Sequence, residues 1–150
     1  MLIRKHLTVA SEIDWLEKSA TPKRGSPERQ AQCSVVEFLE MSLPAGSIVA
    51  AVKNEHGAKG KTEGQRKRFG AKRREEGVKA GFPDLVLCLP GPRVVFIEMK
   101  APKSGVLSDA QRARHAELRA LGFDVAVARS IETAKAALRE MGVPLKGTAT

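Results

Sequence analysis

Two apolar runs separated by a short break form the strongest pattern in the chain. Residues 85–89 read Leu-Val-Leu-Cys-Leu, residues 93–97 read Arg-Val-Val-Phe-Ile, and Pro90-Gly91-Pro92 lies between them. Apolar, β-branched runs joined by turn residues predict the two strands of a hairpin. The second run is almost continuously apolar, which is typical of a strand buried on both faces.

The turn also predicts which residues of the hairpin lie opposite each other. Symmetric pairing about Gly91 places Leu87 opposite Val95 and Asp84 opposite Glu98. Opposite residues of an antiparallel pair share a face, with Cβ atoms about 4.5–5.5 Å apart. We therefore expect two carboxylates side by side at one end of the hairpin.

The rest of the pattern predicts the elements around this hairpin. Ser26 followed by Pro27 is a helix start, and that helix is predicted to run to about Met41. A second helix is predicted to start at Ser108 and to end near Gly122. The other predicted elements are a short helix at 11–18, a buried strand at 47–52, a basic helix in the second half of 53–79, a strand at 123–128 and a helix capped by Ser130.

This order of elements indicates the fold class. After the hairpin, a strand, a helix and another strand follow one another, which predicts a parallel βαβ unit. We predict an α/β fold with a central mixed sheet and helices on both faces. Residues 1–27 are predicted to be an N-terminal appendage, and residues 28–146 the folded domain.

The end of the hairpin carries the most informative chemistry. Lys100 lies two residues after Glu98, so strand alternation places its amine on the face of the two carboxylates. Adjacent like charges are unfavourable unless a cation neutralises them. A divalent ion such as Mg²⁺, held by Asp84, Glu98, a main-chain carbonyl near Met99 and water, suits these oxygen ligands. The ion would lower the pKa of a bound water, and Lys100 would hold that water or stabilise charge on a phosphate. The structural alternative is an ordinary cross-strand ion pair.

Three polar residues on helices are further candidates for this site. Glu28 lies on the inward face of the first helix, although a first-turn glutamate also interacts favourably with the helix dipole. Gln111 and Arg114 interrupt an otherwise apolar helix face just after Lys100, which points to the same site. For Gln111 the alternative is structural, because Ser108 and Gln111 have the spacing of a capping box.

Charge indicates the class of partner. The formal net charge is +9, which favours nucleic acid or an anionic membrane surface. Residues 53–79 hold ten basic residues against four acidic ones. Ion pairs within a solvated helix are the alternative, but the excess favours contacts with phosphate, which would make binding salt-dependent. We predict nucleic-acid contacts at Lys53, Lys59, Lys61, Arg66, Lys67, Arg68, Lys72, Arg73, Arg74 and Arg114.

Composition excludes several other classes. Tyrosine is absent and aromatics are few, which argues against a base-stacking platform of the kind used by single-strand binders. No run has the length of a membrane span, and the N-terminus lacks the apolar region of a signal peptide. Cys33 and Cys88 lie in apolar segments without metal-type spacing. We predict buried free thiols in a reducing compartment and no cysteine-ligated zinc.

The motifs, taken in order, resemble a known nuclease superfamily. Gly81-Phe82-Pro83-Asp84-Leu85, then Phe96-Ile97-Glu98-Met99-Lys100, then Leu107-Ser108 with Gln111 are similar to the PD-(D/E)XK pattern, and more narrowly to the VRR-NUC (virus-type replication–repair nuclease) domain. The similarity spans roughly residues 28–140. It implies a restriction-endonuclease-like core and phosphodiester cleavage that depends on Mg²⁺ or Mn²⁺. It also implies that Asp84 and Glu98 are metal ligands, Lys100 the catalytic lysine, Gln111 an active-site polar group and Glu28 a further acidic residue.

The resemblance also suggests a substrate. Stand-alone members of this family are phage and bacterial homodimers that act on branched DNA, including Holliday junctions. We therefore predict an endodeoxyribonuclease in the cytoplasm of a bacterium or a phage-infected cell, reading DNA structure because no base-reading module is evident. Two alternatives stay open: the same chemistry on linear DNA or RNA, and a non-catalytic basic accessory protein that binds nucleic acid.

Overall fold

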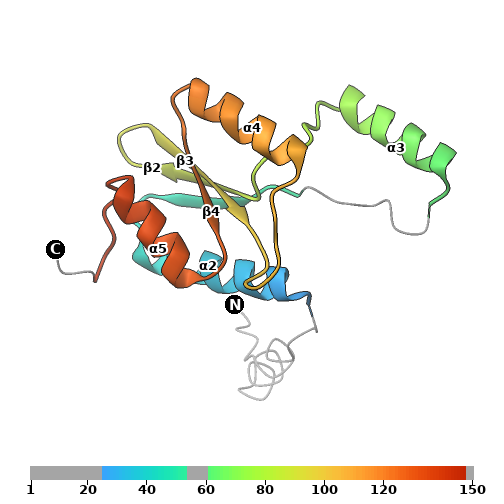
Figure 1. Cartoon of the computed structure of the whole chain (residues 1–150). Coiled ribbons are helices and arrows are strands. Elements are labelled where there is room, and N and C mark those ends of the chain that lie inside the picture. Colours follow the sequence, from blue (N-terminus) through green and yellow to red (C-terminus); the bar gives the residue numbers. More distant parts are fainter. Residues whose placement is uncertain (1–24, 54–60, 148–150) are drawn as a thin grey trace, which may run out of the picture.

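The structure, a computed structural model, describes residues 25–53 and 61–147 (Figure 1). The helix predicted at 11–18 and the basic residue Lys59 lie outside this range. The elements are α2 (Pro27–Ser42), β1 (Ile48–Ala51), α3 (Glu63–Glu75), β2 (Leu85–Leu89), β3 (Arg93–Met99), α4 (Asp109–Ala120), β4 (Asp124–Ala128) and α5 (Ile131–Glu140).

The four strands form one mixed sheet in the order β1-β2-β3-β4. β2 and β3 pair antiparallel with Leu87 opposite Val95, so the predicted register about Gly91 is confirmed. β4 joins β3 in parallel after the crossover helix α4, as the βαβ prediction required. The hairpin therefore occupies the middle of the sheet, and β3 is covered on both faces.

Helices cover both faces of the sheet, and each face has its own apolar core (Figure 1). α2 and α5 pack on one face, where Leu39 and Leu138 contact the inward residues of β2 and β3. α4 packs on the other face through Leu118, against Phe96 and Val125. Because side chains alternate along β3, Glu98 and Lys100 share the α4 face with Phe96.

Local sequence signals explain where the helices begin. The hydroxyls of Ser26, Thr62, Ser108 and Ser130 each accept a hydrogen bond from a backbone N–H in the first turn of their helix. Such side chains satisfy donors that have no partner within the helix, and they stabilise a helix start by about 1 kcal/mol each. The predicted starts at Ser26, Ser108 and Ser130 are confirmed.

Two predictions about burial were wrong. The strand expected to be buried at 47–52 is the edge strand β1, and its Ile48 is 61% exposed. Cys33 and Cys88 are free thiols, but both are exposed. Cys88 lies opposite Ile48 on the α4 side of the sheet, and the core beneath α4 is built from residues on β3 and β4. An apolar run shows that a strand forms, but its position in the sheet decides what covers it.

α3 projects from the body of the molecule (Figure 1). None of its residues is buried, so its formation depends on local interactions, including a capping box between Thr62 and Gln65. The predicted basic helix is therefore confirmed as a solvent-exposed element. Within the described ranges, no helix has both the length and the apolar character needed to cross a membrane.

Candidate active site

Glu98 is the centre of a polar cluster at the end of β3. Its side chain is only 1% exposed. One carboxylate oxygen, Oε1, lies 2.9 Å from Lys100 Nζ and accepts a hydrogen bond from Gln111 Nε2. The other oxygen, Oε2, has no hydrogen-bond partner among the described residues. β3 and the first turn of α4 thus build one side of the site together.

Asp84 reaches the cluster from the end of β2. Its Oδ2 accepts a hydrogen bond from the backbone N–H of Met99 at 2.8 Å, and its main-chain carbonyl accepts one from Val52 N–H at 2.7 Å. These bonds fix the residue where the β2–β3 ladder ends, one position beyond the pair Leu85 and Ile97. The hairpin therefore brings Asp84 beside Glu98, as its register predicted.

Gln111 forms the predicted capping box and also contacts Glu98. Its side-chain Oε1 accepts a hydrogen bond from Ser108 N–H, and its backbone N–H donates to Ser108 Oγ, which completes a capping box. Its amide nitrogen simultaneously donates to Glu98. A single side chain therefore both starts α4 and holds the central carboxylate.

His115 belongs to the site and was missed by the sequence analysis. It is 1% exposed, and its Nε2 lies 3.6 Å from Glu98 Oε2, too far for a hydrogen bond. Neither ring nitrogen has a hydrogen-bond partner among the described residues. The available signal was its spacing, since Gln111, His115 and Leu118 follow one another at the intervals of a helix face.

A short loop after β3 holds the stem of Lys100. A side chain at Gly105 would place its Cβ only 2.8 Å from Lys100 Cβ, so the bare backbone of the loop packs directly on the lysine. Arg129, just after β4, donates hydrogen bonds to the carbonyls of Ala101 at 2.9 Å and Gly105 at 2.5 Å. The guanidinium thereby joins both ends of the loop that packs on Lys100.

Gly81 sets the distance between the Asp84 segment and α4. Its backbone has φ of +73°, which only glycine adopts readily. An added Cβ would lie 2.2 Å from the carbonyl oxygen of Ala110 and 2.7 Å from Gln111 N. This close approach fixes Gln111 relative to the residues that lead into Asp84.

Burial changes the acid–base properties of the cluster. Desolvation raises the pKa of Glu98 to about 7, opposed by its hydrogen bond to Lys100 and assisted by the negative charge of Asp84. Desolvation lowers the pKa of His115, with Arg119 and Lys100 acting in the same direction. Burial therefore favours the neutral form of both side chains, the carboxylic acid of Glu98 and the uncharged imidazole of His115.

Among the described residues, the other predicted site residues form no hydrogen bond or ion pair with Glu98. Glu28 is half-buried in the first turn of α2, and among the described residues it forms no hydrogen bond or ion pair with Asp84, Glu98 or Lys100. Nearby residues of α2 line a depression with Pro102 and Arg129, so the helix begins at the same end of the sheet as the cluster.

Most of the predicted nucleic-acid contacts lie on or next to α3. Arg66, Lys67, Arg68, Lys72, Arg73 and Arg74 belong to this helix, and Lys61 precedes it. Lys53 is exposed after β1. Arg114 instead faces the segment before Asp84, where its Nε donates to Ala80 O at 3.4 Å and its guanidinium pairs with Glu117.

Comparison with known families agrees with this geometry. The family model of the VRR-NUC domain matches residues 12–132. The chain belongs to the VRR-NUC domain family. This is a nuclease family, so the resemblance noted in the motifs is confirmed, and the cluster at Glu98 becomes the candidate active site of a VRR-NUC nuclease.

Solved structures support the same fold. One described as a "VRR_NUC domain protein" superposes with a TM-score of 0.58 at 22% identity, covering 78% of this chain and 88% of that chain. A second, described as a "VRR_NUC domain", gives a TM-score of 0.50 at 21% identity, covering 77% and 97%. Such identities show a shared fold, and no curated protein matches the chain.

The residues present fit a divalent cation in this VRR-NUC site. Within the described ranges there is no cluster of three or more acidic, histidine or cysteine side chains that would hold a metal by itself. Two carboxylates are available, however, and the buried Oε2 of Glu98 has no hydrogen-bond partner there. Together with a carbonyl and water they would make the oxygen-rich, partly hydrated ligand set that Mg²⁺ prefers.

Proposed function

We propose that this VRR-NUC protein is a metal-dependent endonuclease that hydrolyses phosphodiester bonds of DNA. The observation that supports this most directly is the environment of Glu98. One of its oxygens is held by Lys100 and Gln111, and the other lacks a hydrogen-bond partner within the described ranges. The negative charge of Asp84 also acts on the Glu98 carboxyl and raises its pKa. Buried polar atoms are in most cases hydrogen-bonded, so an unsatisfied buried carboxylate oxygen suits a metal ligand better than a purely structural ion pair.

The residues have distinct tasks in this proposal. Asp84, Glu98 and the carbonyl of Met99 would hold Mg²⁺, or Mn²⁺ in its place, and the bound cation would supply neutralisation of phosphate charge and a more acidic water. Lys100 orients the attacking water, since its ammonium is held 2.9 Å from Glu98. The water releases one proton to solvent as its oxygen bonds to phosphorus, the phosphorus–sugar oxygen bond breaks, and the released sugar oxygen takes a proton from solvent.

We further propose that the substrate is branched DNA, such as a Holliday junction, and that the protein acts as a homodimer in a bacterial or phage-infected cell. The basic helix α3 supports a nucleic-acid substrate, because it carries Arg66, Arg68 and other cations on an exposed surface. No base-reading element is evident, which favours recognition of shape.

A cleavage assay tests the proposed function. Wild type, Asp84→Ala and Lys100→Ala are compared on a four-way junction, a flap and a linear duplex, with Mg²⁺, with Mn²⁺ and with EDTA. We expect wild type to cleave the branched substrates only with metal, and both variants to lose cleavage while still binding DNA.

Other outcomes identify the alternatives. Equal cleavage of linear and branched DNA would remove the claim of structure specificity. Binding without cleavage by wild type under every metal condition would favour the non-catalytic accessory protein.

A further inference from the structure

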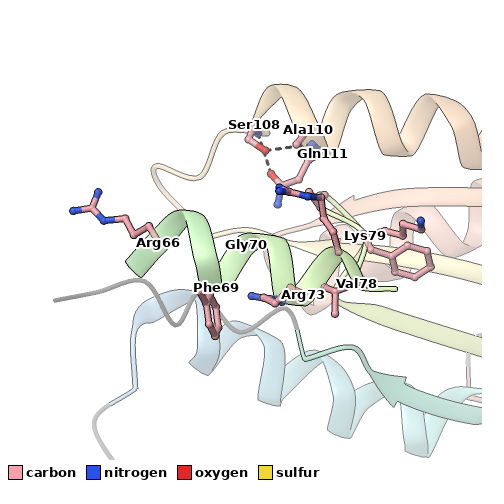
Figure 2. A pocket seen from close by; sticks show the side chains of 13 residues that line it. Arg66, Phe69, Gly70, Arg73, Val78, Lys79, Ser108, Ala110 and Gln111 are labelled. Atoms are coloured by element: carbon pink, nitrogen blue, oxygen red, sulfur yellow. Dashed lines mark hydrogen bonds between the residues drawn. The ribbon is translucent and has the colours of Figure 1, made fainter. Parts of the chain in front are cut away.

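A cavity of about 450 Å³ lies between α3 and the start of α4, with residues 78–82 forming part of its wall (Figure 2). This is within the range of roughly 300–1,000 Å³ that small-molecule sites occupy. Glu98 is not among the residues that line this cavity.

The lining combines positive charge with apolar surface. All four charged residues that line it are basic: Arg66, Arg73, Arg74 and Lys79. Phe69, Val78 and Phe82 supply apolar wall. The ring of Phe69 also has cations over it, with Lys61 Nζ 3.5 Å from the ring centroid. Cations beside aromatic and aliphatic surface suit a ligand that joins an anion to a flat, apolar group, as a nucleotide does.

Gln111 connects this cavity to the candidate active site. It lines the cavity, and its amide donates to Glu98. The close packing of Gly81 against Ala110 and Gln111 holds that shared wall in place. A ligand in the cavity would therefore share Gln111 with the candidate active site at Glu98.

We propose that the cavity binds one unpaired nucleotide of DNA, directly beside the scissile phosphodiester. The basic residues contact its phosphate, and the apolar wall contacts its base. A base that is paired and stacked in a duplex cannot enter such a pocket without leaving the stack, so the cavity favours DNA with an unpaired position at a branch. This inference rests on the proposed nuclease function and specifies its substrate. The few aromatics of the chain suffice, since only one base needs a partner.

A glycine in α3 allows the cavity to be filled without disturbing the core. A side chain at Gly70 would meet only the Arg74 guanidinium, at 3.8 Å from its Cβ, and Gly70 lines the cavity. Gly64 is in the same helix, has open space around it and does not line the cavity. Leucine favours a helix more than glycine does, so Gly70→Leu and its control Gly64→Leu should both fold.

The test measures binding in EDTA, where no cleavage occurs. The probe is a duplex with one unpaired 2-aminopurine at a branch, and a second probe has an abasic site at that position. Wild type and Gly64→Leu should bind the base-containing probe about tenfold more tightly than the abasic probe, as single-base stacking contacts do. They should also change the 2-aminopurine fluorescence. Gly70→Leu should bind both probes equally. Equal affinities in wild type, or discrimination retained in Gly70→Leu, would overturn the proposal.

The same proteins separate this inference from the proposed nuclease function. If wild type discriminates between the probes but cleaves nothing with Mg²⁺ or Mn²⁺, the cavity proposal is supported and the nuclease proposal fails. If wild type cleaves and Asp84→Ala does not, yet base and abasic probes bind equally, only the cavity proposal fails. Absence of any DNA binding would remove both.

Discussion

At the scale of single residues, the site depends on side chains that serve two purposes. Gln111 caps α4 through Ser108 and also donates to Glu98. Glu98 itself is buried by the packing of α4 and yet has an unsatisfied oxygen within the described ranges. Such double use means that a substitution can damage the chemistry without damaging the fold, or the reverse.

The two tasks of Gln111 can be separated by mutation. Gln111→Glu keeps a side chain that completes the capping box, but it places a carboxylate against Glu98. The free energy of unfolding should fall because the two carboxylates repel each other, and the single-turnover cleavage rate should fall about 10- to 100-fold, the loss expected for a hydrogen bond to a charged group.

Ser108→Ala is the matched control for that variant. It removes the hydroxyl cap and leaves the donor to Glu98 in place. It should lose about 1 kcal/mol of stability and retain most of its activity. A cleavage rate for Gln111→Glu equal to that of wild type would contradict the assigned contact.

The raised pKa of Glu98 predicts how stability depends on pH in the metal-free protein. In the folded state this pKa is about 7, against an ordinary value of 4.5, so the folded protein retains a proton that the unfolded chain releases between these values. The free energy of unfolding should therefore fall as pH rises through this window. Asp84, Lys100 and His115 face the same carboxyl. Because the pKa of His115 is lowered from its ordinary value of 6.5, this histidine makes the free energy of unfolding rise with pH below that value, which opposes the effect of Glu98.

Comparison with Glu98→Gln isolates the contribution of this carboxyl. In EDTA, chemical denaturation from about pH 5 to about pH 8 should show wild type losing stability relative to the variant. Added Mg²⁺ should restore wild type at the upper end and leave the variant unchanged, because the cation binds only the folded site. If the free energy of unfolding depended on pH in the same way in both proteins, the shifted pKa of Glu98 would be contradicted.

At the scale of elements, the site is assembled where separate elements end. Asp84 directly precedes β2, Glu98 lies in β3 and Lys100 directly follows it, and α4 provides Gln111 and His115. The loop after β3 packs on Lys100, and Arg129 at the end of β4 holds that loop. Strand ends suit this purpose, because the sheet holds the backbone while the helix and loops that follow the strands enclose the side chains.

Arg129 is predicted to position Lys100 rather than to contact the substrate. Arg129→Gln should free the loop at Ala101 and Gly105, and kcat should fall about tenfold with little change in KM. Arg139→Gln, at an exposed position in the last turn of α5, removes the same charge and should leave kcat unchanged. Equal DNA affinity of the two variants in EDTA, combined with different kcat values, would establish the positioning effect. Equal kcat values would exclude it.

At the scale of the whole molecule, charge and packing are segregated. The packed sheet contains the buried carboxylate, while much of the net charge of +9 is concentrated on and beside α3, which has no buried residue. Exposed ion pairs such as Lys67 with Glu63 stabilise a helix only weakly. The cations of α3 can therefore contact a polyanion without breaking any packing of the core, because no residue of α3 is buried.

Salt dependence tests this use of α3. Replacing Lys67 and Arg68 by glutamine should lower duplex affinity and reduce the slope of log K against log salt by about 0.9 for each lost phosphate contact. The control replaces Lys135 and Arg139 on α5, which packs on the sheet face opposite α4. Titrations at several salt concentrations provide the measurement. The same change of slope in both double variants would indicate a general charge effect instead of a site on α3.

The sequence alone determined the features that depend on neighbours along the chain. The turn at Pro90-Gly91-Pro92 fixed the register of β2 and β3, and that register placed Asp84 beside Glu98. The caps at Ser26 and Ser108 fixed the helix starts, because a capping hydroxyl contacts a backbone group only two or three residues away.

Only the tertiary structure decided which distant groups meet. The contact of His115 with Glu98, the clamp of Arg129 on the 101–105 loop and the exposure of Cys88 all depend on how α4, β4 and β1 are placed around the hairpin. Periodicity indicates that a helix face is buried, but it does not identify what lies opposite that face. The packing of the described elements supplies that information, and with it the buried, unsatisfied oxygen on which the proposed chemistry depends.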